Sequence, residues 1–212
     1  MSDDLLDRLS ASLRPTPAGL VPRRLLTGLA AGGAVSLALV AAILGPRPDL
    51  APAVSQPMFW VKFGYALALA GVGLWAVERL ARPGGLARSR LAWIAAPILT
   101  VTAIALWRLA AEPPAVRMGL VMGHSARLCP WYVLAASLAP FAGLVWAVRG
   151  LAPTRLRLAG LALGFAAGGR GAFAYAMHCD EMAAPFLAVW YTLGVAAAGA
   201  LGWLVGPRIL RW

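Results

Sequence analysis

Apolar residues gather into six long runs along the chain, and short segments rich in Pro, Gly and Arg separate these runs. A hydrocarbon core of roughly 30 Å is crossed by about 20 helical residues, and most of the runs are close to this length. The pattern therefore predicts an all-α fold, namely a polytopic bundle of six transmembrane helices. The predicted spans are Leu25–Leu44, Met58–Val77, Leu91–Trp107, Trp131–Val148, Leu158–Met177 and Pro185–Val205.

The composition of the 212 residues also indicates a membrane protein, since 61% are hydrophobic and only 13% are charged. A soluble domain carries about 25% charged residues, so this chain has too little polar surface for water. The formal net charge of +11 could indicate nucleic-acid binding. However, the arginines stand singly or in pairs at the ends of apolar runs, a placement typical of contact with lipid headgroups. We therefore expect the lipid bilayer as a partner, and no direct contact with nucleic acid.

The distribution of Lys and Arg predicts the orientation, because cytoplasmic connections carry the excess of positive charge. Thirteen of these residues lie on the side of the two termini and four on the other side, while Lys62 and Arg170 fall inside predicted spans. Both termini are therefore expected in the cytoplasm. The predicted organisation is a cytoplasmic segment at 1–24, a membrane domain at 25–205 and a cytoplasmic tail at 206–212. The first apolar run lacks a cleavage motif, so we expect it to remain as a helix.

Two of the predicted spans carry glycine at every fourth position. Gly28 and Gly32 lie in the first span, and Gly160, Gly164 and Gly168 lie in the fifth. Such spacing lets helix backbones approach closely in lipid. Packing within the bundle is the favoured interpretation, and a homodimer is the alternative.

The segment Ser2–Arg14 is predicted to form a short amphipathic helix in the cytoplasm. Four leucines fall within an arc of about 100° on such a helix, and they are Leu5, Leu6, Leu9 and Leu13. Helices that lie on a membrane surface are usually basic, whereas this segment has three acidic residues before its second arginine. A hydrophobic groove on a protein partner is therefore favoured over the membrane surface as its binding site.

Enzyme motifs are nearly absent from the sequence. Residues 123–127 (Gly-His-Ser-Ala-Arg) begin like a nucleophile elbow but lack its closing glycine. The sequence has no Walker loop, no HExxH, no CxxC and no plausible pair of catalytic carboxylates. The prediction is a protein that is not an enzyme and requires no cofactor.

Both cysteines and both histidines are predicted to lie at the non-cytoplasmic face. Cys129 precedes the fourth span and Cys179 follows the fifth, with His124 and His178 close to them in sequence. A structural disulfide, a redox-responsive or metal-responsive pair, and two unrelated buried thiols are all compatible with this placement. Thiolate and imidazole groups together could hold a soft metal ion, although the spacing matches no recognised zinc pattern.

Two cationic residues fall inside predicted spans. Arg170 lies about 10 Å below the outer end of the fifth span, and a central arginine costs about 2.5–3.5 kcal/mol on insertion scales. Its side chain either extends to the membrane surface, or faces the bundle and pairs with an acid or with backbone carbonyls. Lys62 lies closer to the surface, and we expect its side chain to extend outward.

Several stretches together resemble one protein family. They are Asp-Leu-Leu-Asp-Arg-Leu at 4–9, Pro-Met-Phe-Trp-Val-Lys at 57–62, Ser-Ala-Arg-Leu-Cys-Pro at 125–130, His-Cys-Asp-Glu at 178–181 and Trp-Tyr at 190–191. With them the chain resembles the NrsF family, negative regulators of sigma-F-type extracytoplasmic-function (ECF) sigma factors in proteobacteria. The resemblance runs over nearly the whole chain, and the two cysteine contexts are its most specific part.

The resemblance implies a multi-pass anti-sigma factor of the bacterial inner membrane that holds an ECF sigma factor at the inner face. It also implies that Cys129 and Cys179 take part in sensing stress. The predicted helix with Leu5, Leu6 and Leu9 would then bind the sigma factor. One alternative is a small transporter or channel that uses Arg170 and Lys62, and another is a membrane thiol oxidoreductase.

Overall fold

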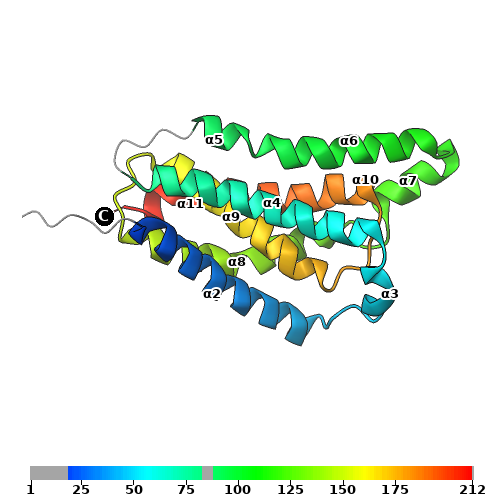
Figure 1. Cartoon of the computed structure of the whole chain (residues 1–212), viewed down its shortest axis with the longest axis horizontal. Helices are drawn as coiled ribbons and strands as arrows, with labels where there is room; N and C mark the ends of the chain where they lie inside the picture. The colour runs from blue at the N-terminus through cyan, green and yellow to red at the C-terminus, as the bar shows by residue number, and fades with distance from the viewer. Residues whose placement is uncertain (1–18, 83–87, 212) are drawn as a thin grey trace, which may run out of the picture.

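The computed structural model describes residues 19–82 and 88–211, and all regular structure within these ranges is helical (Figure 1). This confirms the predicted all-α fold class. The predicted helix at 2–14 lies outside the described residues. The elements are α2 (Leu20–Ile43), α3 (Leu50–Val54), α4 (Pro57–Leu80), α5 (Arg88–Ala92), α6 (Ala95–Ala111), α7 (Pro114–Met122), α8 (Cys129–Arg149), α9 (Leu156–Ala176), α10 (Ala184–Phe186), the π-helical turn η1 (Leu187–Tyr191) and α11 (Thr192–Ile209).

Five helical segments in the described part of the chain are long and apolar enough to cross a membrane. They are Leu20–Ile43, Pro57–Leu80, Ser89–Ala111, Cys129–Arg149 and Ala184–Ile209. The remaining predicted span corresponds to α9, which has a similar length but is rich in Gly and Ala. The prediction of six spans is therefore supported for five helices.

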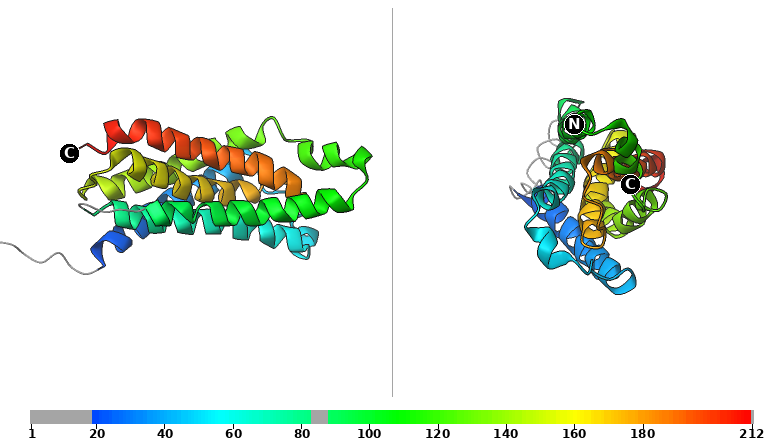
Figure 2. Two further views of the ribbon diagram at one scale, coloured as in Figure 1. Left: turned by 90° about the horizontal axis from the view of Figure 1, so that it is seen from above. Right: turned by 90° about the vertical axis from the view of Figure 1, so that its right-hand side faces the viewer.

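The position of α9 explains its composition. It packs against α2, α4, α8 and α11, and most of its residues are buried. The long helices run side by side along the long axis of the molecule (Figure 2). A helix enclosed by other helices needs small residues for close packing and fewer bulky apolar residues for contact with lipid.

The third predicted span is divided between two helices and ends later than expected. The sequence predicts Leu91–Trp107, whereas α6 runs from Ala95 to Ala111 and follows the short helix α5. It ends before Pro113, since a residue that precedes proline is disfavoured in the helical conformation.

Glycines bring two pairs of helices into backbone contact. In α2, a Cβ atom on Gly28 would overlap with the Gly143 carbonyl of α8. In α9, a Cβ atom on Gly160 would overlap with the Gly202 carbonyl of α11. These glycines therefore pack against helices of the same chain, as the favoured interpretation predicts. The homodimer stays a prediction, and these contacts do not support it.

The two ends of the bundle differ in chemistry. The start of α2 and the end of α11 lie at one end, here called the terminal end, and α3 and α7 lie at the other, here called the cysteine end (Figure 1). At the terminal end three arginines stack on tryptophan rings, and the pairs are Arg24–Trp146, Arg90–Trp75 and Arg157–Trp203. Arginine and tryptophan both favour the boundary between lipid and water, so this end has the character of a membrane interface.

Candidate functional site

Both cysteines are buried at the cysteine end and belong to one hydrophobic core cluster. Cys129 is the first residue of α8 and has no exposed surface, and Cys179 lies in the connection after α9 with 3% of its surface exposed. Both are free thiols in this structure. Tyr175 of α9 and Tyr191 of the π-helical turn belong to the same cluster. The structure thus places the two thiols together in an apolar setting lined by aromatic rings.

Lys62 of α4 points into this cluster. Its ammonium nitrogen donates a hydrogen bond of 2.9 Å to the Cys179 carbonyl oxygen and lies 5.4 Å from the centre of the Tyr191 ring. Only 2% of Lys62 is exposed. The prediction that its side chain extends outward to the membrane surface is therefore wrong. A carbonyl oxygen and an aromatic face take the place of water around the ammonium group.

A second cation, Arg47, contacts the same carbonyl. It lies between α2 and α3, and its Nη1 donates to the Cys179 carbonyl oxygen at 3.4 Å. Nε and Nη2 each donate to a carboxylate oxygen of Asp49 at 2.7 Å. The hydrogen bonds of this bidentate pair are the main cause that raises the pKa of Arg47 and lowers the pKa of Asp49. The backbone N–H of Arg47 also donates to the Met177 carbonyl at 3.1 Å.

His178 ties the same segment to the end of α2. Its Nδ1 lies 2.9 Å from the Gly45 carbonyl oxygen, and because a carbonyl only accepts, Nδ1 carries the proton. Gly45 has a φ of 77°, which a residue with a side chain rarely adopts. His178 therefore holds the connection after α2.

His124 is exposed and faces two acids. Its Nε2 lies 3.1 Å from a carboxylate oxygen of Asp180, and its Nδ1 lies 3.3 Å from a carboxylate oxygen of Glu181. The hydrogen bond with Asp180 is the main cause that raises the pKa of His124, and the negative charges of Glu181 and Asp180 add to it.

Glu181 is the acceptor that joins the two cysteine segments. Its carboxylate accepts the backbone N–H of His124 at 2.7 Å and the backbone N–H of Ser125 at 3.1 Å. Gly123 has a φ of 51°, and a Cβ atom there would overlap with the carboxylate. The loop before Cys129 is therefore closed around the side chain that follows Cys179.

The predicted metal ligands are not arranged as one metal site. Within residues 19–82 and 88–211, no group of three or more His, Cys, Asp and Glu side chains could hold a metal ion. Binding of a soft metal ion by Cys129, Cys179, His124 and His178 stays a prediction, and it would require these side chains to move.

Arg170 belongs to α9, and its side chain extends toward α2. Its guanidinium group rests against Gly33 and lies 4.9 Å from the centre of the Phe173 ring. Its Nη1 is buried without a hydrogen-bond partner among the described residues. The sequence predicts that an inward-facing Arg170 pairs with an acid or with backbone carbonyls. Among the described residues, neither kind of group accepts a hydrogen bond from Nη1.

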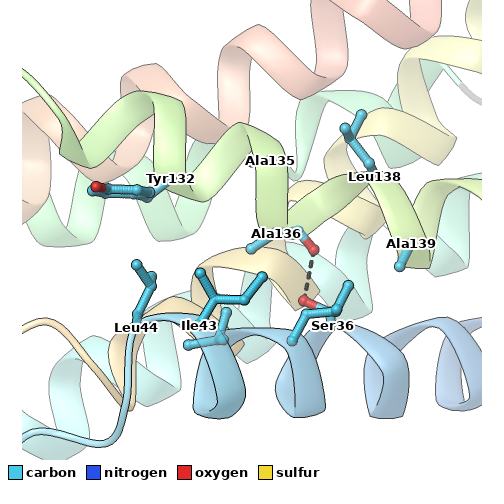
Figure 3. Close-up of a pocket in the computed structure, with 10 residues that line it drawn as sticks. Ser36, Ile43, Leu44, Tyr132, Ala135, Ala136, Leu138 and Ala139 are labelled. Atoms are coloured by element: carbon cyan, nitrogen blue, oxygen red, sulfur yellow. Dashed lines mark hydrogen bonds between the residues drawn. The ribbon is translucent and has the colours of Figure 1, made fainter.

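A groove between α2 and α8 does not involve the intramembrane cations. It has a volume of about 540 Å³ and opens between α2 and α8 (Figure 3). Ser36 donates to the Ala136 carbonyl at 2.6 Å across it. The lining residues are Ser36, Leu39, Val40, Ile43, Leu44, Tyr132, Ala135, Ala136, Leu138 and Ala139. Since Arg170 and Lys62 are not among them, the groove gives no support to a transporter that uses both.

Sequence reasoning missed the roles of three residues. Arg47 was not singled out from the sequence, and Glu181 and Tyr191 entered only through the stretches that carry the family resemblance. The spacing Arg-Pro-Asp at 47–49 was the one local signal for an ion pair. Nothing local indicates that Glu181 closes a loop more than fifty residues away in sequence.

The predicted partner-binding leucines Leu5, Leu6, Leu9 and Leu13 lie outside the described residues.

Comparison with known proteins gives a clear result. The family model NrsF, described as negative regulator of sigma F, matches residues 9–212. A protein of Caulobacter vibrioides (strain NA1000 / CB15N) named anti-sigma-F factor NrsF is 42% identical over 214 residues, which cover 100% of this chain and 99% of the relative. A protein of Azospira oryzae (strain ATCC BAA-33 / DSM 13638 / PS) named probable anti-sigma-F factor NrsF is 38% identical over 211 residues, with 100% and 99% covered. No solved structure matches the chain.

Proposed function

This chain belongs to the NrsF family of negative regulators of sigma F, and from this premise we propose how its parts act. It is a regulatory protein and not an enzyme, as the sequence predicts. In our proposal it lies in the bacterial inner membrane and holds a sigma-F-type ECF sigma factor at the cytoplasmic face. The sigma factor is released when Cys129 and Cys179 react with an oxidant or bind a soft metal ion.

Support for the membrane location comes from the five apolar helices and from the arginine–tryptophan pairs at the terminal end. With the excess of positive charge at that end, the terminal end faces the cytoplasm and the cysteine end faces the periplasm. We infer a sixth crossing by α9, which is enclosed by the other helices.

The sigma factor binds the N-terminal segment in this proposal. Leu5, Leu6, Leu9 and Leu13 form an apolar stripe in the sequence, and the chain then enters α2 at Leu20. A groove on the sigma factor would bury this stripe.

One observation carries the coupling between the two ends, namely that the Cys179 segment is bonded to the outer end of α2. Arg47, which follows α2, donates to the Cys179 carbonyl, and the His178 ring donates to the Gly45 carbonyl at the end of α2. Chemistry at Cys179 would change the anchor of α2, and α2 leads to the sigma-binding segment. To move occupancy from 99% bound to 99% released, the signal must supply about 5.5 kcal/mol. Metal–thiolate bonds reach this scale, whereas a surface ion pair does not.

Serine variants test the proposal. In cells that carry a sigma-F-dependent reporter, Cys129→Ser and Cys179→Ser should each abolish the response to peroxide and to cadmium ions. Both single variants should behave like the double variant, because one site needs both sulfurs.

Ala126→Ser is the matched control, since Ala126 lies in the same buried cluster and this change adds a hydroxyl without removing a thiol. It should respond like the unchanged protein. A normal response of each single cysteine variant would mean that the cysteines are structural and do not sense.

A further inference from the structure

The two thiols have unequal surroundings. The Lys62 ammonium donates to the backbone carbonyl of Cys179 at 2.9 Å, whereas no hydrogen bond among the described residues joins Lys62 to Cys129. Arg47, the other cation near Cys179, is already paired with Asp49. None of the ion pairs among the described residues involves Lys62. The positive charge of Lys62 therefore acts on the thiols without a carboxylate to neutralise it.

A buried ammonium group without an anionic partner is costly, so its surroundings favour negative charge. Cys129 has a competing source of positive potential, because it begins α8. A helix N-terminus acts as about half an elementary charge, whereas an ammonium carries a full one. Since Lys62 is bonded to the backbone of Cys179, its full charge favours negative charge on that segment.

Tyr191 supplies a second observation at the same place. Its ring lies beside Lys62, and its hydroxyl oxygen is buried without a hydrogen-bond partner among the described residues. It ends the π-helical turn Leu187–Tyr191, and such turns are frequent at functional sites. A buried hydroxyl that is not satisfied can donate to an oxygen atom placed on a neighbouring sulfur.

We propose that Cys179 is the thiol that a hydroperoxide oxidises first, that Lys62 is the residue that positions and stabilises it, and that Cys129 then resolves the product. This inference rests on the proposed function, in which the two cysteines form the reactive site. Tyr191 donates a hydrogen bond to the oxygen atom that Cys179 receives.

Oxidation of the two thiols proceeds in two steps. The Cys179 sulfur attacks one oxygen of hydrogen peroxide, so that an S–O bond forms, the O–O bond breaks and hydroxide leaves, which takes up the thiol proton to give water. Cys179 is oxidised to a sulfenic acid and the peroxide is reduced. The Cys129 sulfur then attacks the Cys179 sulfur, an S–S bond forms, and the S–O oxygen leaves as water with the Cys129 proton.

Trapping of sulfenic acid in the full-length protein, purified in detergent, tests the order of oxidation. Cys129→Ser retains only Cys179, and its treatment with hydrogen peroxide and dimedone should give a dimedone adduct by mass spectrometry. Cys179→Ser retains only Cys129 and should form the adduct at least about tenfold more slowly, the factor that 1.36 kcal/mol of differential stabilisation gives. Equal rates, or a faster reaction of Cys129, would overturn the proposal.

Variants in the Cys129→Ser background test Lys62 and Tyr191. Lys62→Met should slow adduct formation about tenfold by the same relation, while Lys62→Arg keeps the charge and should restore much of the rate. Tyr191→Phe should lower the yield of the dimedone adduct, because it removes the hydroxyl that donates to the oxygen atom on Cys179. If Lys62→Met fails to fold, the comparison of the two serine variants and the Lys62→Arg rate still decide. An unchanged rate in folded Lys62→Met would refute the role of Lys62.

These measurements need no sigma factor, so the two proposals can fail separately. If Cys179 reacts first but both serine variants still give a normal reporter response, the order of oxidation stands and the sensing function does not. If the serine variants abolish the reporter response but Cys129 reacts first, the sensing function stands and this inference falls.

Discussion

Two buried cations meet one backbone carbonyl at the cysteine end. Lys62 and Arg47 both donate to the Cys179 carbonyl, from α4 and from the connection after α2. On the other side of this segment, Glu181 closes the loop that precedes Cys129. A short stretch of chain around Cys179 therefore carries contacts from three separate parts of the molecule. A change at this one residue can reach all of them.

At the scale of single residues, His124 should make stability depend on pH. Its pKa is raised above 6.5 by Asp180 and Glu181, so its contribution is fully present below pH 6.5 and is lost as the pH rises through the raised value. His124→Gln should therefore lower the thermal unfolding midpoint in detergent at pH 6 and make little difference at pH 9. The effect is small, on the order of 0.5 kcal/mol, because the side chain is largely exposed.

Asp180→Asn is the control for this interpretation, since it removes the main cause of the pKa shift and leaves the histidine in place. In this variant as well, the loss of thermal unfolding midpoint should be larger at pH 6 than at pH 9. A larger loss for His124→Gln at pH 9 than at pH 6 would contradict the sign of the prediction.

At the scale of helices, close packing by glycine decides which elements are neighbours. α9 meets α11 through Gly160 and Gly164, and α2 meets α8 through Gly28 and Gly32. Gly71 of α4 has open space around it. Similar residues in similar helices thus have different roles, and the positions with a facing backbone are the ones that hold the bundle.

Gly160→Val should destabilise the bundle strongly, because its Cβ would overlap with the Gly202 carbonyl and separate α9 from α11. Overpacking of a tight contact costs typically about 1–3 kcal/mol. Gly71→Val is the matched control, with the same change in a helix but open space around the new side chain. Thermal unfolding in detergent compares the two. Equal losses would mean that the α9–α11 contact is not as close as described.

The N-terminal segment gives the second prediction at this scale. Leu6→Asp combined with Leu9→Asp should abolish co-purification of the sigma factor, because charges would replace the apolar stripe that we propose to be buried. Insertion into the membrane should be unaffected. Ala11→Asp, on the opposite face of the predicted helix, is the matched control and should retain the sigma factor. Full retention by a variant that lacks residues 2–14 would place the binding on another cytoplasmic segment.

At the scale of the whole molecule, the bundle separates two chemistries. Arginine–tryptophan pairs lie at the terminal end, while both thiols, both histidines and the acids Asp180 and Glu181 lie at the cysteine end. Because α2 is anchored at the cysteine end by His178 and Arg47, it can link events there to the opposite end. This arrangement suits a regulator that receives a signal on one side of a membrane and holds its partner on the other.

The orientation can be tested with reporters fused to each terminus, and both should report a cytoplasmic location. Cysteine labelling needs a specific reagent, because both thiols are buried and free. A bulky membrane-impermeant maleimide should react slowly with the folded protein from either side. A cysteine placed at exposed Met118 of α7, in a chain without the two native cysteines, should be labelled rapidly from the periplasm. Labelling of this position only from the cytoplasm would reverse the orientation.

Sequence alone determined the properties that depend on composition along the chain. Apolar runs interrupted by Pro and Gly identified helices close to the observed ones, because the length and hydropathy of a span are local quantities. The four-residue glycine spacing predicted close packing within the bundle, and the cysteine contexts at 125–130 and 178–181 carried the family resemblance. The charge distribution likewise predicted a common side for both termini.

Tertiary structure alone decided which side chains meet. Lys62 lies on Cys179 instead of at the surface, Glu181 closes the loop before Cys129, and the least apolar of the long helices lies among the others. Each of these facts depends on which helices are neighbours and how they are rotated. Hydropathy indicates that a residue lies in a membrane span, but not which way its side chain points, because in lipid the partners of a polar group come from other helices.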